Sequence, residues 1–537
     1  MRTGMHRRAA VLTALFLAIV TLAMALMSAN SGHDWGDDFA GYISQAIAIA
    51  QGTLEQQAHI NLVTHPSDLS FLPAGADSLV YVWGLSLMLV PVYWLFGYDT
   101  DSFSSIIYYK LPGILCLAGL AAVLFLFYRR RFPWPMALLC AVALVFSAEI
   151  FSSVSQIVTD LPLLFFVMLS LLLAQLFFDS LDGPAARRTL LSLALGLSLW
   201  WAYAVRLNGV SVVLACLLSS ALEMWKRRRG LRLRAVCAQL APYLFFALLL
   251  LVSYSLLPVP TSNASDFGRV SLSLFLSQLE ALFGDLCAWI GGLLPIPLGG
   301  AVSVCFQAFF WICFAWGAWS EGSRGSLPLL LLALGTLLGT CLLPYGSGQG
   351  LRYAYPALPL LLLFAGCGAL RIWRAIFTHL NGRLRRPLAF LARALAVLAA
   401  CVVLLASFSD ALSAYERRGR ERPVGDAFST EAVEMYHYIQ LNTPQDALIS
   451  FFKPRLLLLN TGRMCCKLQV SPSLDPDPNV FLTYQQRPLD IDSIDYFLLY
   501  QDDGSQLDII LQELGAHSGE ITPVYSNATF SLYQRVR

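Results

Sequence analysis

Long apolar stretches recur along most of the 537-residue chain and are separated by short polar segments. About 20 apolar residues are enough to cross the hydrocarbon core of a bilayer as an α-helix. We therefore predict an all-α polytopic membrane domain with about eleven transmembrane helices. The predicted spans are 9–29, 104–128, 136–152, 161–178, 189–205, 208–224, 236–257, 301–319, 327–344, 356–372 and 391–410.

Clusters of Lys and Arg indicate the orientation of these spans, because short loops rich in these residues stay in the cytoplasm. The side of the membrane on which the later loops lie depends on whether one further apolar segment, 79–97, crosses. If it does not cross, the basic clusters at 129–131, 226–234 and 371–386 all fall on the side of the N-terminus. If it crosses, every later basic loop lies outside. We therefore predict that 79–97 is re-entrant or interfacial, that the N-terminus is cytoplasmic, and that the C-terminal region lies outside.

The composition changes at about residue 413, where a charged linker replaces the apolar runs. Alternating and helical patterns then predict a small soluble α/β domain. We assign residues 1–412 to the membrane domain, with a large first outer loop at 30–103, and residues 413–537 to the soluble domain. Its predicted elements are helices at 430–441, with Ser429 as the cap, and at 505–514, and strands at 447–452, 495–500 and 529–533.

Composition excludes several classes of function. The chain is 57% hydrophobic and 13% charged, whereas soluble proteins carry about 25% charged residues. The net charge of +2 gives no indication of a nucleic-acid partner, and the 12 cysteines follow no disulfide or zinc spacing. Because the sequence has neither a Walker A loop nor a Rossmann glycine motif, any energy for a reaction has to come from the substrate.

An acidic cluster, Asp34, Asp37 and Asp38, follows the first span directly. Ionisable groups at a membrane surface are candidates for function. Residues 42–52 are typical of a short amphipathic helix, whose N-terminal dipole favours the preceding anions. The pair Asp37 and Asp38 can therefore act as a helix cap, as a general base for a hydroxyl group, or as ligands for a divalent cation.

Three charged residues lie at the outer ends of later spans. Asp160 precedes Pro162, so the carboxylate can cap the next helix or belong to the same site as Asp37. Arg206 and Arg352 lie outside, against the positive-inside trend. Guanidinium groups bind phosphate oxygens bidentately, although an arginine at a lipid boundary can also simply extend to water. Further candidates for substrate binding are Tyr42, His65, Tyr345 and Tyr353.

Four motifs in order resemble the GT-C superfamily of membrane glycosyltransferases, in particular the family of protein mannosyltransferases and aminoarabinose transferases. The likeness covers the whole chain. In this sequence Asp38 stands where the family usually has Glu, and His65-Pro66 where it has His-Pro-Pro. The motifs are Trp35 to Tyr42 with Ala48 to Gly52, Thr159 to Pro162, Arg352-Tyr353 with Pro356 and Pro359, and Lys453 to Arg455 with Thr461 to Arg463.

The resemblance implies a bacterial inner-membrane enzyme that moves a sugar, with inversion, from a polyprenyl-phosphate donor to a hydroxyl group. The acceptor is a glycan, lipid or protein of the cell envelope, reached in the periplasm. By position, Asp37 or Asp38 is the base, Asp160 supports the same centre, and Arg206 and Arg352 hold the donor phosphate. No cofactor is implied with certainty, and a divalent cation stays open. The alternatives are a transporter or flippase for a lipid-linked glycan, a polymerase, and a non-enzymatic scaffold.

Overall fold

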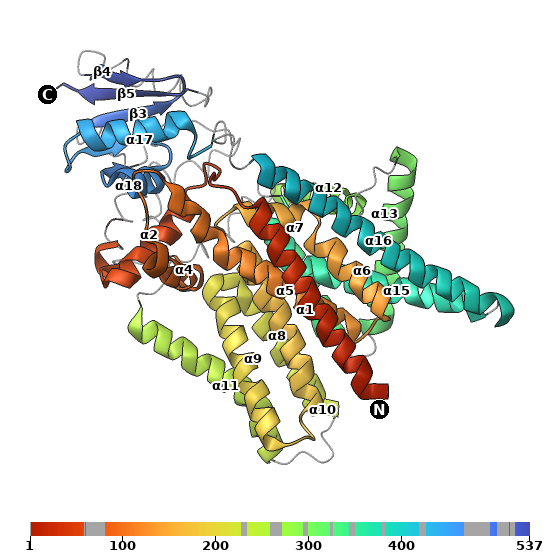
Figure 1. The fold of residues 1–537 in the computed structure, drawn as a ribbon. Helices are drawn as coiled ribbons and strands as arrows, with labels where there is room; N and C mark the ends of the chain where they lie inside the picture. Colours follow the sequence, from red (N-terminus) through yellow and green to blue (C-terminus); the bar gives the residue numbers. More distant parts are fainter. Residues whose placement is uncertain are drawn as a thin grey trace.

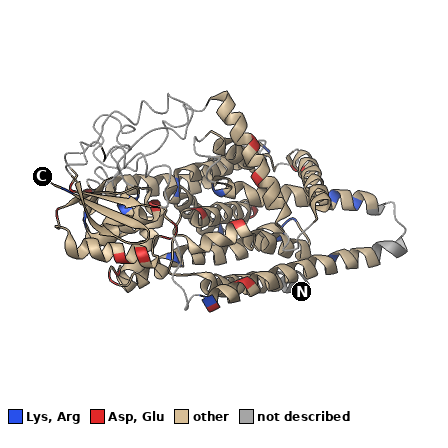
Figure 2. Cartoon of the chain, turned by 90° about the horizontal axis from the view of Figure 1, so that it is seen from above, with Lys and Arg blue, Asp and Glu red and all other residues tan. Residues whose placement is uncertain are grey.

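The computed structural model describes residues 2–57, 60, 81–226, 233–257, 271–293, 299–322, 326–342, 350–378, 382–417, 426–466, 494–501, 515 and 521–536. A bundle of long helices carries a small sheet domain at one end (Figure 1). Positions occupied by Lys, Arg, Asp or Glu are sparse along the ribbon of the bundle helices (Figure 2). The architecture of an all-α membrane domain with a small α/β domain is the predicted one.

Ten of the described helices are long and apolar enough to cross a membrane, or eleven if the bent pair α6 and α7 counts as one span. That pair bends by 50°. The helices of the bundle are α1 (Arg2–Ser28), α5 (Leu111–Arg129), α6 (Trp134–Val145), α7 (Ala148–Ser152), α8 (Asp160–Asp179), α9 (Ala185–Val205), α10 (Val210–Lys226), α11 (Leu233–Leu256), α12 (Leu272–Gly291), α13 (Gly300–Glu321), α14 (Leu327–Thr340), α15 (Leu358–Thr378) and α16 (Gly382–Arg417).

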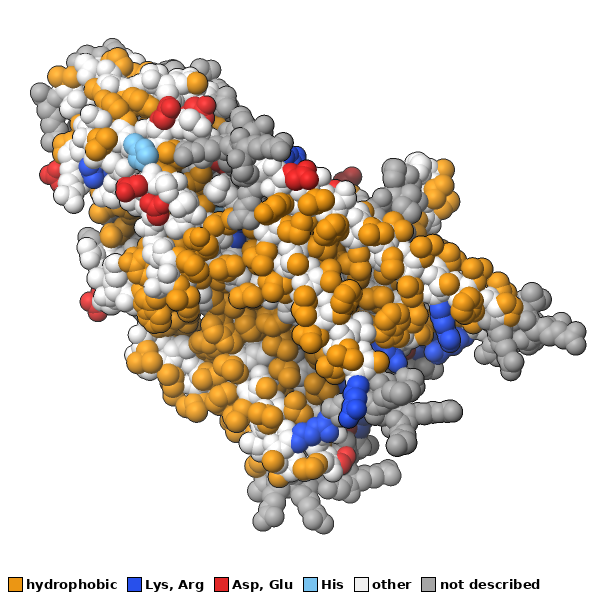
Figure 3. Space-filling view, in the orientation of Figure 1, with side chains coloured by type: hydrophobic (Ala, Val, Ile, Leu, Met, Phe, Trp, Pro, Cys, Tyr) orange, Lys and Arg blue, Asp and Glu red, His pale blue; other side chains and the backbone are white. Residues whose placement is uncertain are grey.

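Ion pairs mark one end of the bundle, which we call the basic end. Arg131, just after α5, lies 3.2 Å from Glu321 at the end of α13, and Arg371 of α15 bonds the same carboxylate. Arg131 also donates to Ser326, just before α14. Lys and Arg side chains follow this edge of a broad hydrophobic surface (Figure 3). The end of α13 and the start of α14 therefore lie at the same end of the bundle.

A contact at the opposite end of the bundle joins the ends of two helices. Tyr203, near the end of α9, bonds Tyr254, near the end of α11, at 2.7 Å. Helix α11 therefore ends opposite the basic end, and α13 starts there. Helix α12, which lies between them in the sequence, is 20 residues long. Helix α14 has only 14 helical residues and starts at the basic end.

The outer loop contains three short elements beside the bundle: α2 (Asp38–Gln51), α4 (Trp83–Phe96) and the 3-10 helix η2 (Ser104–Lys110). Helix α2 starts at Asp38, four residues earlier than predicted. Helix α4 has 14 residues, so it is about 21 Å long and shorter than the ~30 Å hydrocarbon core. Because α14 has the same length, the length alone does not decide whether 79–97 crosses, and that stays a prediction.

The tail domain, residues 426–536 as far as they are described, is a five-stranded sheet in the order β2-β1-β3-β5-β4. Strand β1 is parallel to β2 and β3, and β5 is antiparallel to β3 and β4. Ser429 caps α17 by accepting from the Ala432 N–H, as predicted. The predicted helix at 505–514 lies outside the described residues. The elements are α17 (Thr430–Asn442), β1 (Leu448–Ser450), α18 (Pro454–Thr461), β2 (Met464–Cys466), β3 (Tyr496–Tyr500), β4 (Ile521–Ser526) and β5 (Phe530–Arg535).

Buried hydrophobic residues form one large core in the bundle and a second core that joins the outer loop to the tail domain. The second core contains Phe39 and Ile43 of α2 together with Phe428, Tyr436 and Leu456 of the tail. Because apolar burial is the main stabilising term, the outer loop and the tail domain form one packed unit above the bundle.

Candidate active site

Asp160 holds two arginines that the sequence placed at the outer ends of separate spans. Its Oδ1 accepts from Arg206 Nη1 at 2.7 Å, and its Oδ2 accepts from Arg352 Nη2 at 2.8 Å. The Asp160 side chain is only 1% exposed, whereas the two arginine side chains are 22% and 37% exposed. Two guanidinium groups share one carboxylate, so this cluster has an excess positive charge at a surface that substrates can reach.

The capping role considered for Asp160 is not what its carboxylate does. Thr159 is the N-cap residue of α8, and no side chain bonds the first turn there. Asp160 is the first residue of the helix and directs its carboxylate to the arginines instead. Arg206 follows the end of α9 in an extended conformation, and its guanidinium lies 4.3 Å from the centre of the Tyr353 ring. This stacking orients the guanidinium plane.

Asp37 lies at the N-cap position of α2 but does not cap the helix with its side chain. Its Oδ1 instead accepts from the backbone N–H of Leu456, in the first turn of α18, at 3.1 Å. Burial raises the pKa of Asp37, while the charges of Arg455 and Lys453 act against that rise. A carboxylate with a raised pKa is suited to accept a proton from a hydroxyl group.

Asp38 is the exposed member of the pair, with a side chain that is 71% exposed. Tyr81 donates its hydroxyl to Asp38 Oδ1 at 2.9 Å, and Arg455 Nη1 lies 3.8 Å from the same oxygen. Arg455 also donates to the Tyr81 hydroxyl, with its guanidinium 4.9 Å from the centre of the Tyr81 ring. Sequence reasoning missed both residues, although the motif from Lys453 to Arg455 was visible.

Tyr42 lies between the acid pair and the arginine cluster. Its hydroxyl bonds the side chain of Thr159, next to Asp160. Burial raises the pKa of Tyr42, and the charges of Asp38, Arg206 and Asp160 all act on it. Its ring lies 4.5 Å from that of Tyr81. Asp38 of the acid pair and the arginine cluster around Asp160 therefore both lie near Tyr42.

His33 and Asp34 join the outer loop to the segment before α8. His33 Nε2 accepts from the Ile157 N–H at 3.0 Å, so the ring proton is on Nδ1, which lies 2.7 Å from Asp34 Oδ1. Asp34 also accepts from Gln156 Nε2 at 3.2 Å, and the hydrogen bond from His33 lowers its pKa. Because both ring nitrogens are engaged, His33 is suited to position the loop rather than to exchange protons.

Two predicted site residues, His65 and Tyr345, lie outside the described residues. The start of α2 carries Asp37, Asp38 and Tyr42, and contacts join Asp160, Arg206, Arg352 and Tyr353 into a second group. Among the residues that the structure describes, no three His, Cys, Asp or Glu side chains gather as a metal site would require. The oxygens of the acid pair contact hydrogen-bond donors from Leu456 and Tyr81.

Comparison with solved structures shows which fold positions this site. The chain aligns with ArnT from Cupriavidus metallidurans bound to undecaprenyl phosphate, with a TM-score of 0.56, 16% identity, and coverage of 96% of this chain and 97% of that one. The apo ArnT structure gives a TM-score of 0.53, 16% identity, and coverage of 99% and 98%.

A second membrane enzyme shares the architecture. The oligosaccharyltransferase AglB from Archaeoglobus fulgidus, in complex with an inhibitory peptide and a dolichol-phosphate, aligns with a TM-score of 0.55 and 11% identity over 99% of this chain and 75% of that one. The chain has the GT-C fold. No family model and no curated protein matches the sequence. In this GT-C fold the acid pair and the arginine cluster lie at one end of the bundle, beside the tail domain.

Proposed function

We propose that the protein is an inverting glycosyltransferase that moves a sugar from a polyprenyl-phosphate donor to a hydroxyl group of an envelope glycan, lipid or protein. The observation that carries this proposal is the arrangement of Asp160 between Arg206 and Arg352, with Tyr42 close enough to be influenced by both this cluster and Asp38. The solved GT-C relatives that hold undecaprenyl phosphate and a dolichol-phosphate support the class of donor.

The arginine cluster is suited to bind the donor phosphate. Arg206 and Arg352 each present a planar guanidinium near the surface, and Asp160 and Tyr353 hold these groups in place. When the bond between the sugar and the phosphate breaks, negative charge grows on the leaving polyprenyl phosphate. Positive groups that are already oriented stabilise that charge without reorganising.

The acid pair is suited to activate the acceptor. The acceptor oxygen attacks the anomeric carbon from the face opposite the phosphate, and its proton passes to Asp37. A new carbon–oxygen bond forms as the bond to the phosphate oxygen breaks, so the configuration inverts. Asp37 has a raised pKa, which brings it closer to the range of an effective general base.

The apolar bundle supplies the place for the donor's lipid tail, because its surface is broadly hydrophobic (Figure 3). We place the site at the outer face of a bacterial inner membrane, with the basic end of the bundle in the cytoplasm. A donor embedded in the outer leaflet would then bring its phosphate to the level of Arg206 and Arg352.

Purified protein in lipid nanodiscs, incubated with a panel of polyprenyl-phosphate sugars and envelope acceptors, tests the proposal. We expect release of polyprenyl phosphate and a labelled acceptor. Asp37→Asn should lower kcat by about 10²-fold or more, because it removes the base, while donor KM changes little. Arg352→Ala should weaken donor binding by about tenfold to a hundredfold, because charged hydrogen bonds are lost.

Matched controls come from the same elements. Arg371→Ala removes an arginine at the basic end of α15, and Asp101→Asn removes an exposed outer-loop carboxylate. Both should keep wild-type turnover and donor affinity. Lipid-linked sugar that moves between leaflets with its phosphate bond intact would instead identify a transporter. Equal and mild effects of Asp37→Asn and Arg352→Ala would show that these residues only support the loops.

A further inference from the structure

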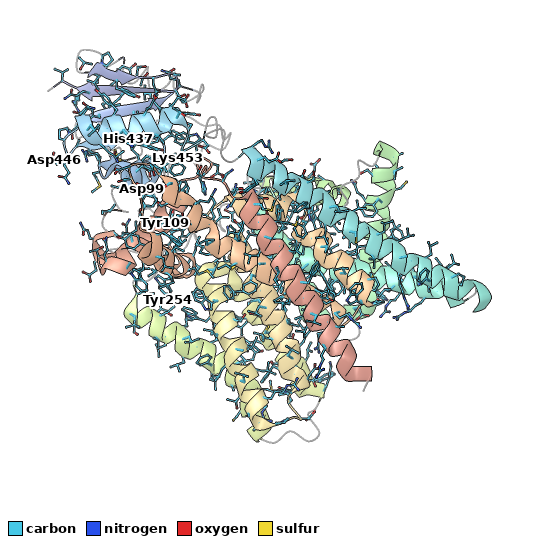
Figure 4. All side chains as sticks on the ribbon, viewed as in Figure 1. Asp99, Tyr109, Tyr254, His437, Asp446 and Lys453 are labelled. Atoms are coloured by element: carbon cyan, nitrogen blue, oxygen red, sulfur yellow. The ribbon has the colours of Figure 1, made fainter. Side chains whose placement is uncertain are left out.

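The tail domain is held against the outer loop by polar contacts spread over a wide junction. The Ala427 N–H donates to the His33 carbonyl at 3.1 Å, and the Tyr98 hydroxyl donates to Asn460 Oδ1 at 2.6 Å. His437 Nε2 lies 2.8 Å from the Asp101 carbonyl. His437 and Lys453 of the tail and Asp99 of the outer loop are labelled at this junction in Figure 4. Several contacts far apart restrict rotation of the domain.

Aromatic side chains of the outer loop insert into the tail domain. The Trp35 ring packs within 5.3–6.2 Å of Phe451, Phe452, Tyr500 and Phe530. Phe103 is buried against Phe428 and Tyr436, and its φ of 56° is unusual for a bulky residue. Such a backbone conformation persists only where the surroundings hold it, so the tail domain is docked and not merely tethered.

The first turn of α18 brings this docked domain onto the acid pair. The Leu456 N–H bonds Asp37, and Arg455, with a side chain that is 10% exposed, reaches Tyr81 and Asp38. Helix α18 packs on α2, the helix that begins with Asp38. A buried arginine that contacts a tyrosine hydroxyl and an exposed carboxylate restricts the rotamers of both.

We infer that Arg455 is a positioning residue for the proposed transfer, through which the tail domain holds Asp38 by way of Tyr81 and leaves Asp37 to accept the proton. This inference rests on the proposed function and assigns separate roles within the acid pair. Asp37 is the half-buried member that faces the α18 backbone. Asp38 is the exposed member, and its orientation depends on Tyr81 and Arg455.

The tail domain contains a second arginine with a purely structural pattern of contacts. Arg463 donates to the carbonyl oxygens of Gln440, Thr443 and Thr461, which lie at the ends of α17 and α18. Cations at helix C-termini stabilise the helix. Arg463→Ala is therefore a matched control that perturbs the same domain without touching the acid pair.

The test compares Arg455→Ala, Arg455→Lys, Tyr81→Phe and Arg463→Ala in the full-length protein. Arg455→Ala should lower kcat by about 10²-fold, because the acid pair loses its orientation, while donor KM stays within about twofold. Tyr81→Phe should lower kcat in the same direction. Arg455→Lys keeps the charge but not the planar group, so it should recover only part of the turnover.

The pKa of Asp37 provides a second measurement, which would not change if Arg455 had only a structural role. Burial is the dominant effect and raises the pKa of Asp37, Asp38 raises it further, and Arg455 and Lys453 lower it. Arg455→Ala should therefore shift the acidic limb of the pH–rate profile to higher pH, and Arg455→Lys should restore it. The infrared band of the protonated Asp37 carboxyl, identified by its loss in Asp37→Asn, should shift its midpoint in the same way without any turnover.

The inference would be overturned by a wild-type kcat in Arg455→Ala and Tyr81→Phe. An unchanged infrared midpoint in Arg455→Ala would overturn it as well. An equal loss of kcat in Arg463→Ala would also overturn it, because the effect would then be one of domain stability. If the wild-type protein releases no polyprenyl phosphate from any donor, the proposed function fails, and the infrared midpoint alone decides the role of Arg455. If Arg455→Ala does not fold, Arg455→Lys and Tyr81→Phe carry the same comparison.

Discussion

Asp160 is almost fully buried and shares its carboxylate between two guanidinium groups. Removing one partner from a buried ion pair costs more than the pair itself contributes, because a charge remains without compensation. Here the second arginine provides that compensation. Asp160 therefore stays neutralised by two guanidinium groups whose combined charge exceeds its own, which is why the cluster suits an anionic ligand better than a single ion pair would.

Lys110 positions the start of the acidic loop, and its substitution provides a prediction at this scale. Its ammonium group is 1% exposed and donates to Asn30 O and Oδ1 at 2.9 Å and to Gly32 O at 2.6 Å. Lys110→Met should leave buried oxygens without donors, at about 1–3 kcal/mol for each group. We expect a lower thermal unfolding midpoint and lower kcat, measured together in nanodiscs.

The control for this prediction is Lys226→Met, which removes an exposed lysine at the basic end that pairs with Glu223. Both measurements should stay at wild-type values there. An unchanged unfolding midpoint in Lys110→Met would show that the turn at 30–32 does not need its ammonium group.

The sequence predicted the residues of the arginine cluster and the acid pair, but not their partners. The pattern of charged loops predicts the side of the membrane on which each loop lies. Asp160, Arg206 and Arg352 were therefore expected at the same face of the membrane. Arg455 was not expected beside Asp38, because contacts between the first loop and α18 span up to 419 residues of sequence. No local pattern encodes a contact of that kind. His65 and Tyr345 stay predictions.

At the scale of elements, the backbones of α13 and α15 approach each other closely. A Cβ atom built on Gly317 would lie 1.8 Å from the Phe364 carbonyl oxygen, and one on Gly368 would lie 1.9 Å from that of Cys313. Small residues at such positions let two backbones approach closely, which is a main source of helix association in membranes.

Gly368→Ala should therefore force α13 and α15 apart. We expect a destabilisation of about 1–3 kcal/mol or more, because a methyl group does not fit into the contact. Thermal unfolding in detergent measures it. Gly335→Ala in α14, where a Cβ atom meets nothing within 4 Å, is the control and should be neutral or slightly stabilising. Equal midpoints for the two variants would contradict the close packing.

The pattern of apolar runs predicted most elements, and its misses have physical causes. Helix α12 was not predicted because Glu280 and Asp285 interrupt its apolar run. Helix α14 was expected at 327–344 but ends at Thr340. Strands β2 and β4 are short or edge strands with weak alternation, whereas β1, β3 and β5 were found close to their predicted positions.

At the scale of the whole molecule, the junction between bundle and tail contains a titrating group. Burial raises the pKa of Asp426 to about 6, although Lys110 and His33 act to lower it. An unfolded Asp has a pKa of about 3.9. The folded protein therefore binds this proton more tightly, and the stability that it contributes is complete below about pH 4 and lost as the pH rises through about 6.

Asp426→Asn should remove this contribution. We expect its free energy of unfolding to vary less between pH 4 and 6 than that of the wild type, as measured by denaturant unfolding at several pH values. Asp446→Asn, which changes an exposed carboxylate of the same domain, should keep the wild-type slope (Figure 4). A wild-type slope in Asp426→Asn would assign the pH dependence to other groups.

The contact between Asp37 and Leu456 also has a consequence for biosynthesis. The acidic loop leaves the translocon early, but its partner follows 419 residues later. At about 5–20 residues per second, the ribosome needs at least 20 seconds to supply that partner. Throughout this interval the nascent polypeptide holds an unfinished site, so under the proposed function a prematurely terminated product would be inert.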